Sequence, residues 1–349
     1  MKSSKALATT AIALSLLALT ACSSGSKSGS AASSSAPVVR NVLTNLVGAN
    51  GPVLAVKIDD TEPAHPQIGL DKADVVYIEQ VEGGLSRIAA IFSDPTRLPE
   101  LIGPVRSARI SDLDILAQYG HVGFAFSGAQ TLFYPMIDSA NLTNLSADRN
   151  PATMYSRDNT RFAPTNLILH PHVLLDAAIN QQHKQVDTVK PIGFTFGAAP
   201  AGGTTITSAA FHWPASHYVA QWNATLGQWT FTYDGKPDLA ADGAPLGSPT
   251  LIIQNVSITD SQFKDRHGGV TPFSNTVGSG TAYLLRDGKE FPILWNRASA
   301  TVGTTWTTPD GKPANMGTGQ IWIALTDNPP VFTYPVSPTT QATSTPSSK

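Results

Sequence analysis

The apolar segments of this chain change in character near residue 190, and that change constrains the fold more than any other feature. Before it, apolar runs of strand length alternate with segments of helical pattern. Alternation of this kind predicts an α/β layer structure, with Ser111 as the N-cap of the first helix. The predicted strands span residues 52–58, 73–81, 87–92 and 121–126, and the predicted helices span 111–118, 129–137 and 171–182.

After residue 190 the apolar runs are short and rich in β-branched and aromatic residues. They span residues 218–222, 229–233, 250–258, 281–285, 291–295 and 321–325. Asp-Gly pairs at 234, 287 and 310 separate several of them as tight turns. All six tryptophans lie in this part of the chain, and tryptophan in a sheet more often fills a core than stacks on a sugar. We therefore expect a predominantly antiparallel β domain with buried tryptophans.

These patterns predict two folded domains between flexible ends. The expected fold class is an α/β N-terminal domain over residues 51–190, a mixed sheet with flanking helices, followed by a smaller β-rich C-terminal domain over 191–334. Residues 22–50 include a Ser-rich run that is typical of a flexible tether. The Ser-, Thr- and Pro-rich segment 335–349 is expected to be disordered.

Residues 1–21 have the parts of a secretory signal peptide: lysines near the start, a short apolar run and small residues at its end. The sequence Leu19-Thr20-Ala21-Cys22 resembles a bacterial lipobox, in which the cysteine carries a lipid such as palmitate. Because Cys22 is the only cysteine in the chain, it has no disulfide partner. We expect a protein anchored to the cell membrane through Cys22, on the extracytoplasmic face. The alternative is an ordinary secretory peptide whose cysteine has no role.

The charge of the chain argues against a nucleic-acid binder. Its formal net charge is -2 and only 14% of its residues are charged, so no broad basic surface is expected. The basic residues are nevertheless segregated, because only arginines and no lysine lie between Lys72 and Lys184. Arginine presents a planar donor fork that pairs with carboxylates and phosphates in fixed geometry. The set favours an anion site; the alternative is a group of internal ion pairs.

Two of these arginines, Arg106 and Arg109, follow Gly103-Pro104 and precede the first predicted helix. A helix start offers free backbone N–H groups, which together with arginines bind anions. Ser107 lies between them without a histidine or lysine beside it in sequence, so we expect it to hydrogen-bond phosphate rather than act as a nucleophile. The predicted ligand-binding residues are Arg87, Arg106, Ser107, Arg109, Arg157 and Arg161.

Carboxylates at predicted strand ends belong to the same region. Asp59 and Asp60 follow the first strand, at the kind of position where α/β sheets gather ligands. Beside a phosphate they are candidate ligands for Mg²⁺, which prefers oxygen donors. The alternative is a structural network in which the carboxylates neutralise the arginines and no ligand binds.

Five motifs resemble those of the DUF3048 family of bacterial lipoproteins. They are Lys57-Ile58-Asp59-Asp60, Pro66-Gln67-x-Gly69-Leu70-x-Lys72-Ala73-Asp74, Glu82-Gly83-Gly84-x-x-Arg87, Ile102-Gly103-Pro104-Val105-Arg106-Ser107-Ala108-Arg109 and Arg157-Asp158-x-x-Arg161. The resemblance implies an N-terminal α/β domain and a smaller β-rich domain on a lipid anchor, and it brings no settled activity. The chain departs from the family pattern at residues 126–130, where Phe-Ser-Gly-Ala-Gln stands in place of a histidine-rich turn.

The order of motifs also resembles that of the LytR-CpsA-Psr phosphotransferases, in which arginines hold a pyrophosphate and a carboxylate organises a metal ion. That resemblance implies a metal at Asp59 or Asp60 and a base at Asp74 or Glu82, so that the candidate catalytic residues are Asp59, Asp74 and Glu82.

Three functions therefore stay open, and whether the protein is an enzyme stays open with them. The first is binding of an anionic, phosphate- or pyrophosphate-bearing ligand of the cell envelope. The second is a metal-dependent phosphotransferase or hydrolase acting on pyrophosphate-linked envelope intermediates. The third is a scaffold for a membrane-protein partner. Binding is favoured, because no motif specifies a nucleophile with its base.

Overall fold

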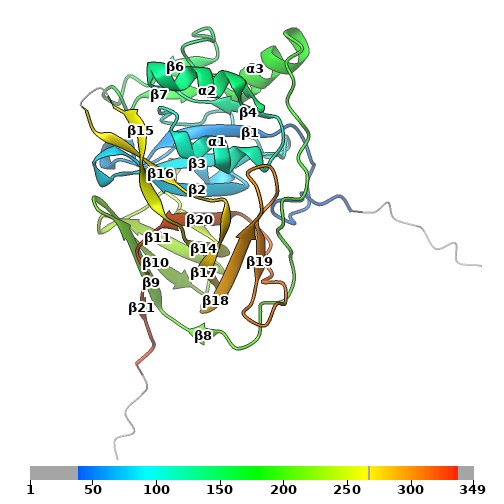
Figure 1. The fold of residues 1–349 in the computed structure, drawn as a ribbon, viewed down its shortest axis with the longest axis vertical. Helices are drawn as coiled ribbons and strands as arrows, with labels where there is room; N and C mark the ends of the chain where they lie inside the picture. Colours follow the sequence, from blue (N-terminus) through cyan, green and yellow to red (C-terminus); the bar gives the residue numbers. More distant parts are fainter. Residues whose placement is uncertain (1–37, 266–267, 337–349) are drawn as a thin grey trace, which may run out of the picture. The chain divides into compact units, whose positions relative to one another are not determined.

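Strands dominate the structure. The computed structural model describes residues 38–265 and 268–336, and strands make up 41% of these residues against 12% for helices. Most strands belong to one mixed sheet (Figure 1). The strands of this larger sheet are β1 (Leu54–Asp59), β2 (Val75–Gln80), β3 (Ser86–Phe92), β4 (Val122–Ala125), β5 (Leu142–Asn144), β8 (Thr204–Thr205), β14 (Thr250–Asn255), β17 (Gly278–Arg286), β18 (Lys289–Arg297), β19 (Thr305–Thr307) and β20 (Ile321–Thr326). The fold is thus strand-rich and multi-sheeted, and the expected α/β alternation is only partly observed.

The larger sheet joins the segments on either side of residue 190. Its order is β19-β18-β17-β14-β20-β2-β3-β1-β4-β5, and β8 pairs with β18. At the junction β2 and β20 run parallel, with Val75 opposite Ile321. Both strands are buried along nearly their whole length, as expected when both faces of a sheet are covered. The two segments expected as separate domains therefore meet within one sheet.

A smaller antiparallel sheet and two hairpins complete the strands of the described residues. The smaller sheet contains β9 (Ser208–Trp213), β10 (Ser216–Asn223), β11 (Gln228–Tyr233), β12 (Lys236–Pro237), β13 (Gly247–Ser248) and β21 (Val331–Thr333); the hairpins are β6 (Tyr155–Arg157) with β7 (Leu167–Leu169) and β15 (Ile258–Lys264) with β16 (Val270–Ser274). The Asp234-Gly235 and Asp287-Gly288 turns have positive φ at both residues, which is the backbone that two-residue hairpin turns require.

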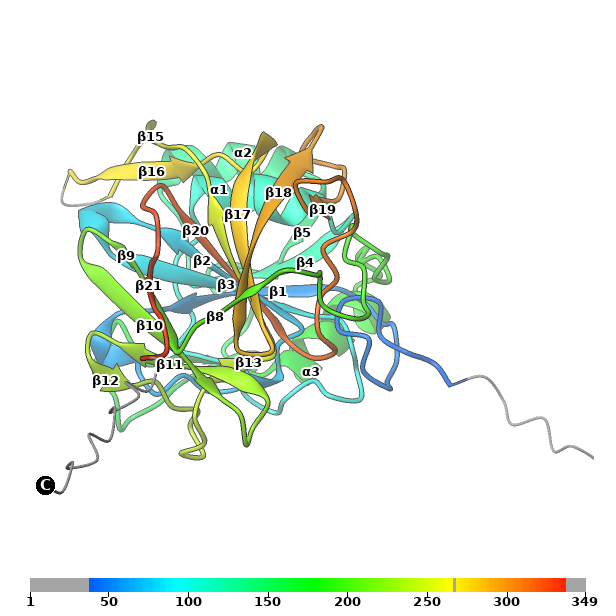
Figure 2. The ribbon, with the colours of Figure 1, turned by 90° about the horizontal axis from the view of Figure 1, so that it is seen from below.

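The helices are short and lie on both faces of the larger sheet. They are α1 (Ile110–Ala117), α2 (Tyr134–Ser139) and α3 (Pro171–Leu175), the last continued by a π-helical segment, Asp176–Gln181. Figure 2 shows α1, α2 and the hairpin β15–β16 on one side of the larger sheet, with α3 and the smaller sheet on the other.

The predicted N-cap of the first helix is wrong. Arg109 occupies that position, and its backbone N–H donates to Asp112 Oδ2 at 2.7 Å. Ser111 lies inside α1 and is buried, where its Oγ accepts a hydrogen bond from the backbone N–H of Ser274 at 3.0 Å. The N-cap therefore lies two residues earlier than predicted, because an aspartate three residues after Arg109 satisfies the free N–H.

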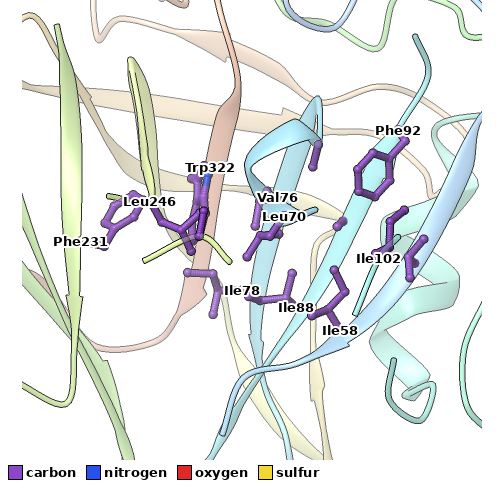
Figure 3. Packing of buried hydrophobic residues seen from close by; sticks show 14 of the residues in the cluster. Ile58, Leu70, Val76, Ile78, Ile88, Phe92, Ile102, Phe231, Leu246 and Trp322 are labelled. Atoms are coloured by element: carbon purple, nitrogen blue, oxygen red, sulfur yellow. The ribbon is translucent and has the colours of Figure 1, made fainter. Parts of the chain in front are cut away.

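Tryptophans fill the core, as predicted. Trp213, Trp229 and Trp322 are fully buried. Trp322 on β20 lies between Phe231 on one side and Val76 of β2 on the other (Figure 3). Its ring centroid is 4.5 Å from that of Phe231, and its Nε1 donates to Gln320 Oε1 at 2.6 Å. One side chain thus ties the smaller sheet to the junction of the larger one.

The tether predicted over residues 22–50 ends earlier than expected. Leu43 is fully buried, and Asn41 Nδ2 donates to Ser93 Oγ at 3.0 Å. Cys22, the signal peptide 1–21 and most of the tail 335–349 lie outside the described residues. In the part of the chain that the structure describes, no helix has the length and hydrophobicity needed to cross a membrane.

A polar network joins the loop after β1 to the smaller sheet. Asp60 accepts hydrogen bonds from Tyr218 OH at 2.7 Å and Ser86 Oγ at 2.5 Å. His65 Nδ1 lies 2.8 Å from Asp238 Oδ1 and its Nε2 lies 3.4 Å from Asp60 Oδ1. Burial alone would lower the pKa of His65, but the two carboxylates outweigh it and raise the pKa to about 10. The histidine is therefore a cation held between two carboxylates.

Truncating Trp322 to alanine should destabilise the protein strongly. We expect the free energy of unfolding to fall by about 3–5 kcal/mol, because a fully buried indole is replaced by a cavity. Urea titration followed by circular dichroism measures the change. Trp222→Ala, at a half-buried position, is the matched control and should lower the free energy of unfolding clearly less. An equal decrease in both variants would show that Trp322 does not contribute more to stability than a half-buried tryptophan.

The stabilising effect of His65 should depend on pH. A raised pKa in the folded state means that the contribution is complete below the unfolded value of about 6.5 and is lost as pH rises through about 10. We expect the difference in unfolding free energy between the wild type and His65→Gln to shrink between pH 6.5 and pH 10. His217→Gln, which replaces an exposed histidine, should show no comparable trend. A wild-type advantage over His65→Gln that is constant across this range would contradict the assignment.

Candidate functional site

The ends of three neighbouring strands carry a row of buried charged side chains. Arg87 near the start of β3 lies opposite Asp59 at the end of β1 and opposite Glu79 on β2. Because side chains alternate along a strand, Lys57 shares this face of the sheet with Asp59. It is the face that α1 covers.

The turn between β2 and β3 brings Glu82 beside this row. Gly83 and Gly84 have φ values of 71° and 73°, a region that side-chain-bearing residues rarely adopt. A Cβ on Gly84 would lie 2.6 Å from Cβ of Pro214. The turn therefore depends on glycine both for its backbone and for its close contact with the smaller sheet.

The segment 103–109 crosses the end of β1 before it enters α1. The backbone N–H of Asp59 donates to the carbonyl of Pro104 at 2.9 Å, and the N–H of Arg106 donates to the carbonyl of Lys57 at 2.8 Å. These bonds fix the segment against the strand, so its two arginines extend from a rigid support and not from a free loop.

Arg87, Arg106 and Arg109 line one cavity of about 650 Å³, together with Ser107 and Glu82. That volume is typical of a small-molecule site. The remaining lining residues are Thr61, Leu85, Ala108, Ile110, Ala129, Gln130, Thr131, Phe133, Pro164, Phe263, Lys264, Asp265 and Thr271. Four of the six predicted ligand-binding residues thus meet in one place.

Two of the three arginines already have carboxylate partners. Arg106 Nε donates to Asp59 Oδ2 at 2.8 Å. Arg109 holds Glu82 Oε2 through Nε at 2.8 Å and Nη2 at 2.7 Å, while Thr271 donates its hydroxyl to Glu82. Burial would raise the pKa of Glu82, but the charge and hydrogen bonds of Arg109 hold it below its usual value. For these two arginines, the carboxylates neutralise the positive charge, as the alternative of a structural network predicted.

Arg87 is different. Its side chain is only 4% exposed, and its Nε and Nη1 have no hydrogen-bond partner among the described residues. Burial lowers the pKa of Arg87 to about 10, assisted by the positive charges of Arg109 and Arg106 and opposed by Asp59 and Glu82. A buried guanidinium without partners is costly. Because Arg87 lines the cavity, its positive charge would attract an anion bound there.

A buried charged triad lies beneath the arginines. Lys57 Nζ donates to Asp112 Oδ1 at 2.7 Å and to Glu79, and all three residues are fully buried. Asp112 also accepts the backbone N–H of Arg109, so the triad supports the arginine segment directly. Burial, reinforced by the charge of Asp112, raises the pKa of Glu79 to about 7 against the attraction of Lys57.

Our sequence interpretation gave Lys57 and Asp112 no role in the site. The available signal was a lysine in an otherwise apolar strand, two residues before Asp59. A lone buried lysine needs a carboxylate partner, but the sequence does not say that the partner comes from a helix 55 residues later.

The turn at residues 126–130, where the chain departs from the expected family pattern, forms part of the cavity wall. The N–H of Ser127 donates to the carbonyl of Arg106 at 2.8 Å, and the N–H of Ala108 donates to the carbonyl of Gly128 at 3.0 Å. Ser107 Oγ lies 3.3 Å from Ser127 Oγ. The turn thus clamps the arginine segment from the side opposite β1.

Arg157 and Arg161 do not line this cavity. Arg157 is exposed and donates to Asn166 Oδ1 at 2.8 Å. Arg161 donates to the carbonyls of Ala64 at 2.8 Å and Pro66 at 2.6 Å, which fastens the β6–β7 loop to the segment after β1. The lysine-free run of arginines predicted a larger cluster, because the sequence does not show which of these arginines reach the same cavity.

The candidate catalytic and metal-binding carboxylates are also separated. Asp74 precedes β2, at the end opposite Glu82, and accepts from the N–H and Oγ of Ser93 at 2.6 and 2.8 Å. Neither Asp59 nor Asp60 lines the cavity, and their oxygens accept hydrogen bonds from protein groups. Of these carboxylates only Glu82 faces it. Across residues 38–265 and 268–336, no group of three or more His, Cys, Asp or Glu side chains is placed to hold a metal ion.

Comparison with known proteins agrees with the resemblance carried by the motifs. The model of the N-terminal domain of DUF3048, a protein family of unknown function, matches residues 43–185, and that of the DUF3048 C-terminal domain matches residues 209–323. The chain is 34% identical over 303 residues to YerB of Bacillus subtilis, whose name describes it as a candidate lipoprotein; the alignment covers 76% of this chain and 84% of YerB.

The fold of this chain is also similar to that of a solved structure. The crystal structure of YerB from Bacillus subtilis superposes with a TM-score of 0.69 at 20% sequence identity, covering 83% of this chain and 97% of the other. Both family models fall on segments that share the larger sheet described above. The chain therefore belongs to the DUF3048 family.

Proposed function

We propose that the cavity binds an anionic, phosphate- or pyrophosphate-bearing ligand of the cell envelope, and that the protein is anchored to the membrane through Cys22. The observation that carries the proposal is Arg87, a buried cation that lines the cavity and lacks hydrogen-bond partners at two of its nitrogens. Most buried donors in folded proteins have an acceptor, so a buried guanidinium with two unpaired nitrogens beside a cavity calls for an explanation.

The neighbouring arginines support the same ligand chemistry. Arg106 engages Asp59 through Nε, and no hydrogen bond from its two Nη nitrogens is found among the described residues. A phosphate beside Arg87 would therefore meet donors from two guanidinium groups, which recognise phosphate bidentately. The Ser107 hydroxyl lines the same cavity and can donate a further hydrogen bond.

Binding without turnover fits the cavity better than phosphotransfer. Ser107 Oγ has Ser127 Oγ as its partner, and a second hydroxyl is not a general base. Glu82 faces the cavity, but its two oxygens are held by Arg109 and Thr271. A metal-dependent phosphotransferase and a scaffold for a membrane protein stay alternatives that no contact in the cavity favours.

Replacing Arg87 separates a ligand site from a structural network. We expect Arg87→Met to weaken binding of pyrophosphate at least tenfold, because hydrogen bonds to a charged group are lost. We also expect the ligand-free variant to be as stable as the wild type or more stable, because a buried charge without partners is removed. Isothermal titration calorimetry and urea unfolding measure the two effects.

Arg157→Met, which removes an exposed arginine outside the cavity, is the matched control and should change neither quantity. Two results would overturn the proposal. One is a wild-type protein that binds neither phosphate nor pyrophosphate. The other is an Arg87→Met variant that loses stability while its anion binding is unchanged.

In the proposed site Glu82 competes with the ligand for Arg109. Removing its charge should therefore strengthen ligand binding, whereas removing Arg87 should weaken it. Glu82→Gln keeps the shape of the side chain and removes its charge, so Arg109 becomes available to an anion. We expect pyrophosphate binding to strengthen by roughly three- to tenfold. Glu290→Gln removes a buried carboxylate outside the cavity and should leave the affinity unchanged. Weaker binding in Glu82→Gln would mean that this carboxylate helps to hold the ligand.

A further inference from the structure

Part of the cavity wall is apolar. Phe133 beside α2 and Phe263 on β15 both line it, and their ring centroids are 5.2 Å apart. Ile110 and Ala129 add aliphatic surface from α1 and from the clamping turn. A site for a free inorganic anion would need only the charged part, because water solvates the rest of such a ligand. The apolar wall therefore indicates a ligand with an apolar group attached to its anionic group.

Two large apolar side chains lie exposed on the segments that carry lining residues. Leu132 is 73% exposed between the lining residues Thr131 and Phe133. Phe162 is 91% exposed, two residues before the lining residue Pro164. The backbone beneath Phe162 is held in place, because its carbonyl accepts hydrogen bonds from the N–H of Thr165 at 3.0 Å and its Oγ1 at 2.9 Å. We call Leu132 and Phe162 the apolar rim.

The chain between Cys22 and the first described residue is short. If Cys22 carries the lipid, only residues 23–37 separate the anchor from the first described residue. Fifteen residues reach at most about 50 Å when fully extended. Exposed phenylalanine and leucine are residue types that partition into lipid or cover a lipid chain.

We infer that the ligand is amphipathic: a lipid-linked phosphate or pyrophosphate whose anionic group meets Arg87 and whose hydrocarbon chain leaves along Phe133, Phe263 and the apolar rim. This inference rests on the proposed function, since the same arginines bind the anionic group. It adds that the hydrocarbon chain supplies affinity that inorganic pyrophosphate lacks. Charge complementarity fixes one end of the ligand and the apolar wall fixes the other.

The test compares two probes that share an anionic group. Farnesyl pyrophosphate and inorganic pyrophosphate are titrated into the full chain carrying Cys22→Ala, so that no lipid of its own occupies the site. We expect farnesyl pyrophosphate to bind at least tenfold more tightly, because burial of a hydrocarbon chain adds to the same ionic contacts. In Leu132→Ser/Phe162→Ser this advantage should fall about tenfold or more, with the affinity for inorganic pyrophosphate unchanged.

Leu226→Ser/Val302→Ser removes two exposed apolar residues outside the cavity, 51% and 47% exposed, and should keep the full advantage of farnesyl pyrophosphate. If inorganic pyrophosphate binds and farnesyl pyrophosphate binds no more tightly, the inference fails and the proposed function stands. If the rim variant keeps the full advantage, the assignment of the chain to Leu132 and Phe162 is overturned. If neither probe binds, the proposed function itself is overturned.

Discussion

The ion pair between Lys57 and Asp112 is the interaction on which the site depends. It joins the middle of β1 to the first turn of α1, and the same carboxylate accepts the backbone N–H of Arg109. A fully buried lysine must keep its partners, because removal of one of them leaves an uncompensated charge. The spacing between strand and helix is therefore fixed by electrostatics as well as by packing, and the cavity lies where that spacing places three arginines.

The site combines two arrangements that are usually alternatives. Arg106 and Arg109 are paired with carboxylates, as in a structural network, whereas Nε and Nη1 of Arg87 have no partner among the described residues. The network holds the neighbours rigid, so the vacancy at Arg87 does not close by rearrangement. Rigid, preorganised donors bind an anion at low entropic cost. In the proposed function, the paired arginines hold the site rigid and the unpaired Arg87 contacts the ligand.

Local patterns in the sequence predicted much of the fold: the strands of the first half, the Asp-Gly turns and the burial of the tryptophans. They did not predict that β2 pairs with β20, because parallel pairing depends on contacts between distant segments. For the site, motif spacing brought Arg87, Arg106, Ser107 and Arg109 together. It also grouped Asp74 and Arg161 with them, since sequence order does not show which end of a strand or which side of a loop a residue occupies.

The parallel pairing of β2 with β20 also has a consequence for how the protein is made. β2 leaves the ribosome about 240 residues before its neighbour, which at ordinary rates of synthesis is an interval of about 12–50 s. During that time the partner edge of a hydrophobic strand has no native neighbour, and open strand edges of this kind associate with other chains. The larger sheet can close only after β20 has been synthesised, so a product truncated near residue 190 would expose the edge permanently. The two halves of this chain therefore complete the larger sheet together.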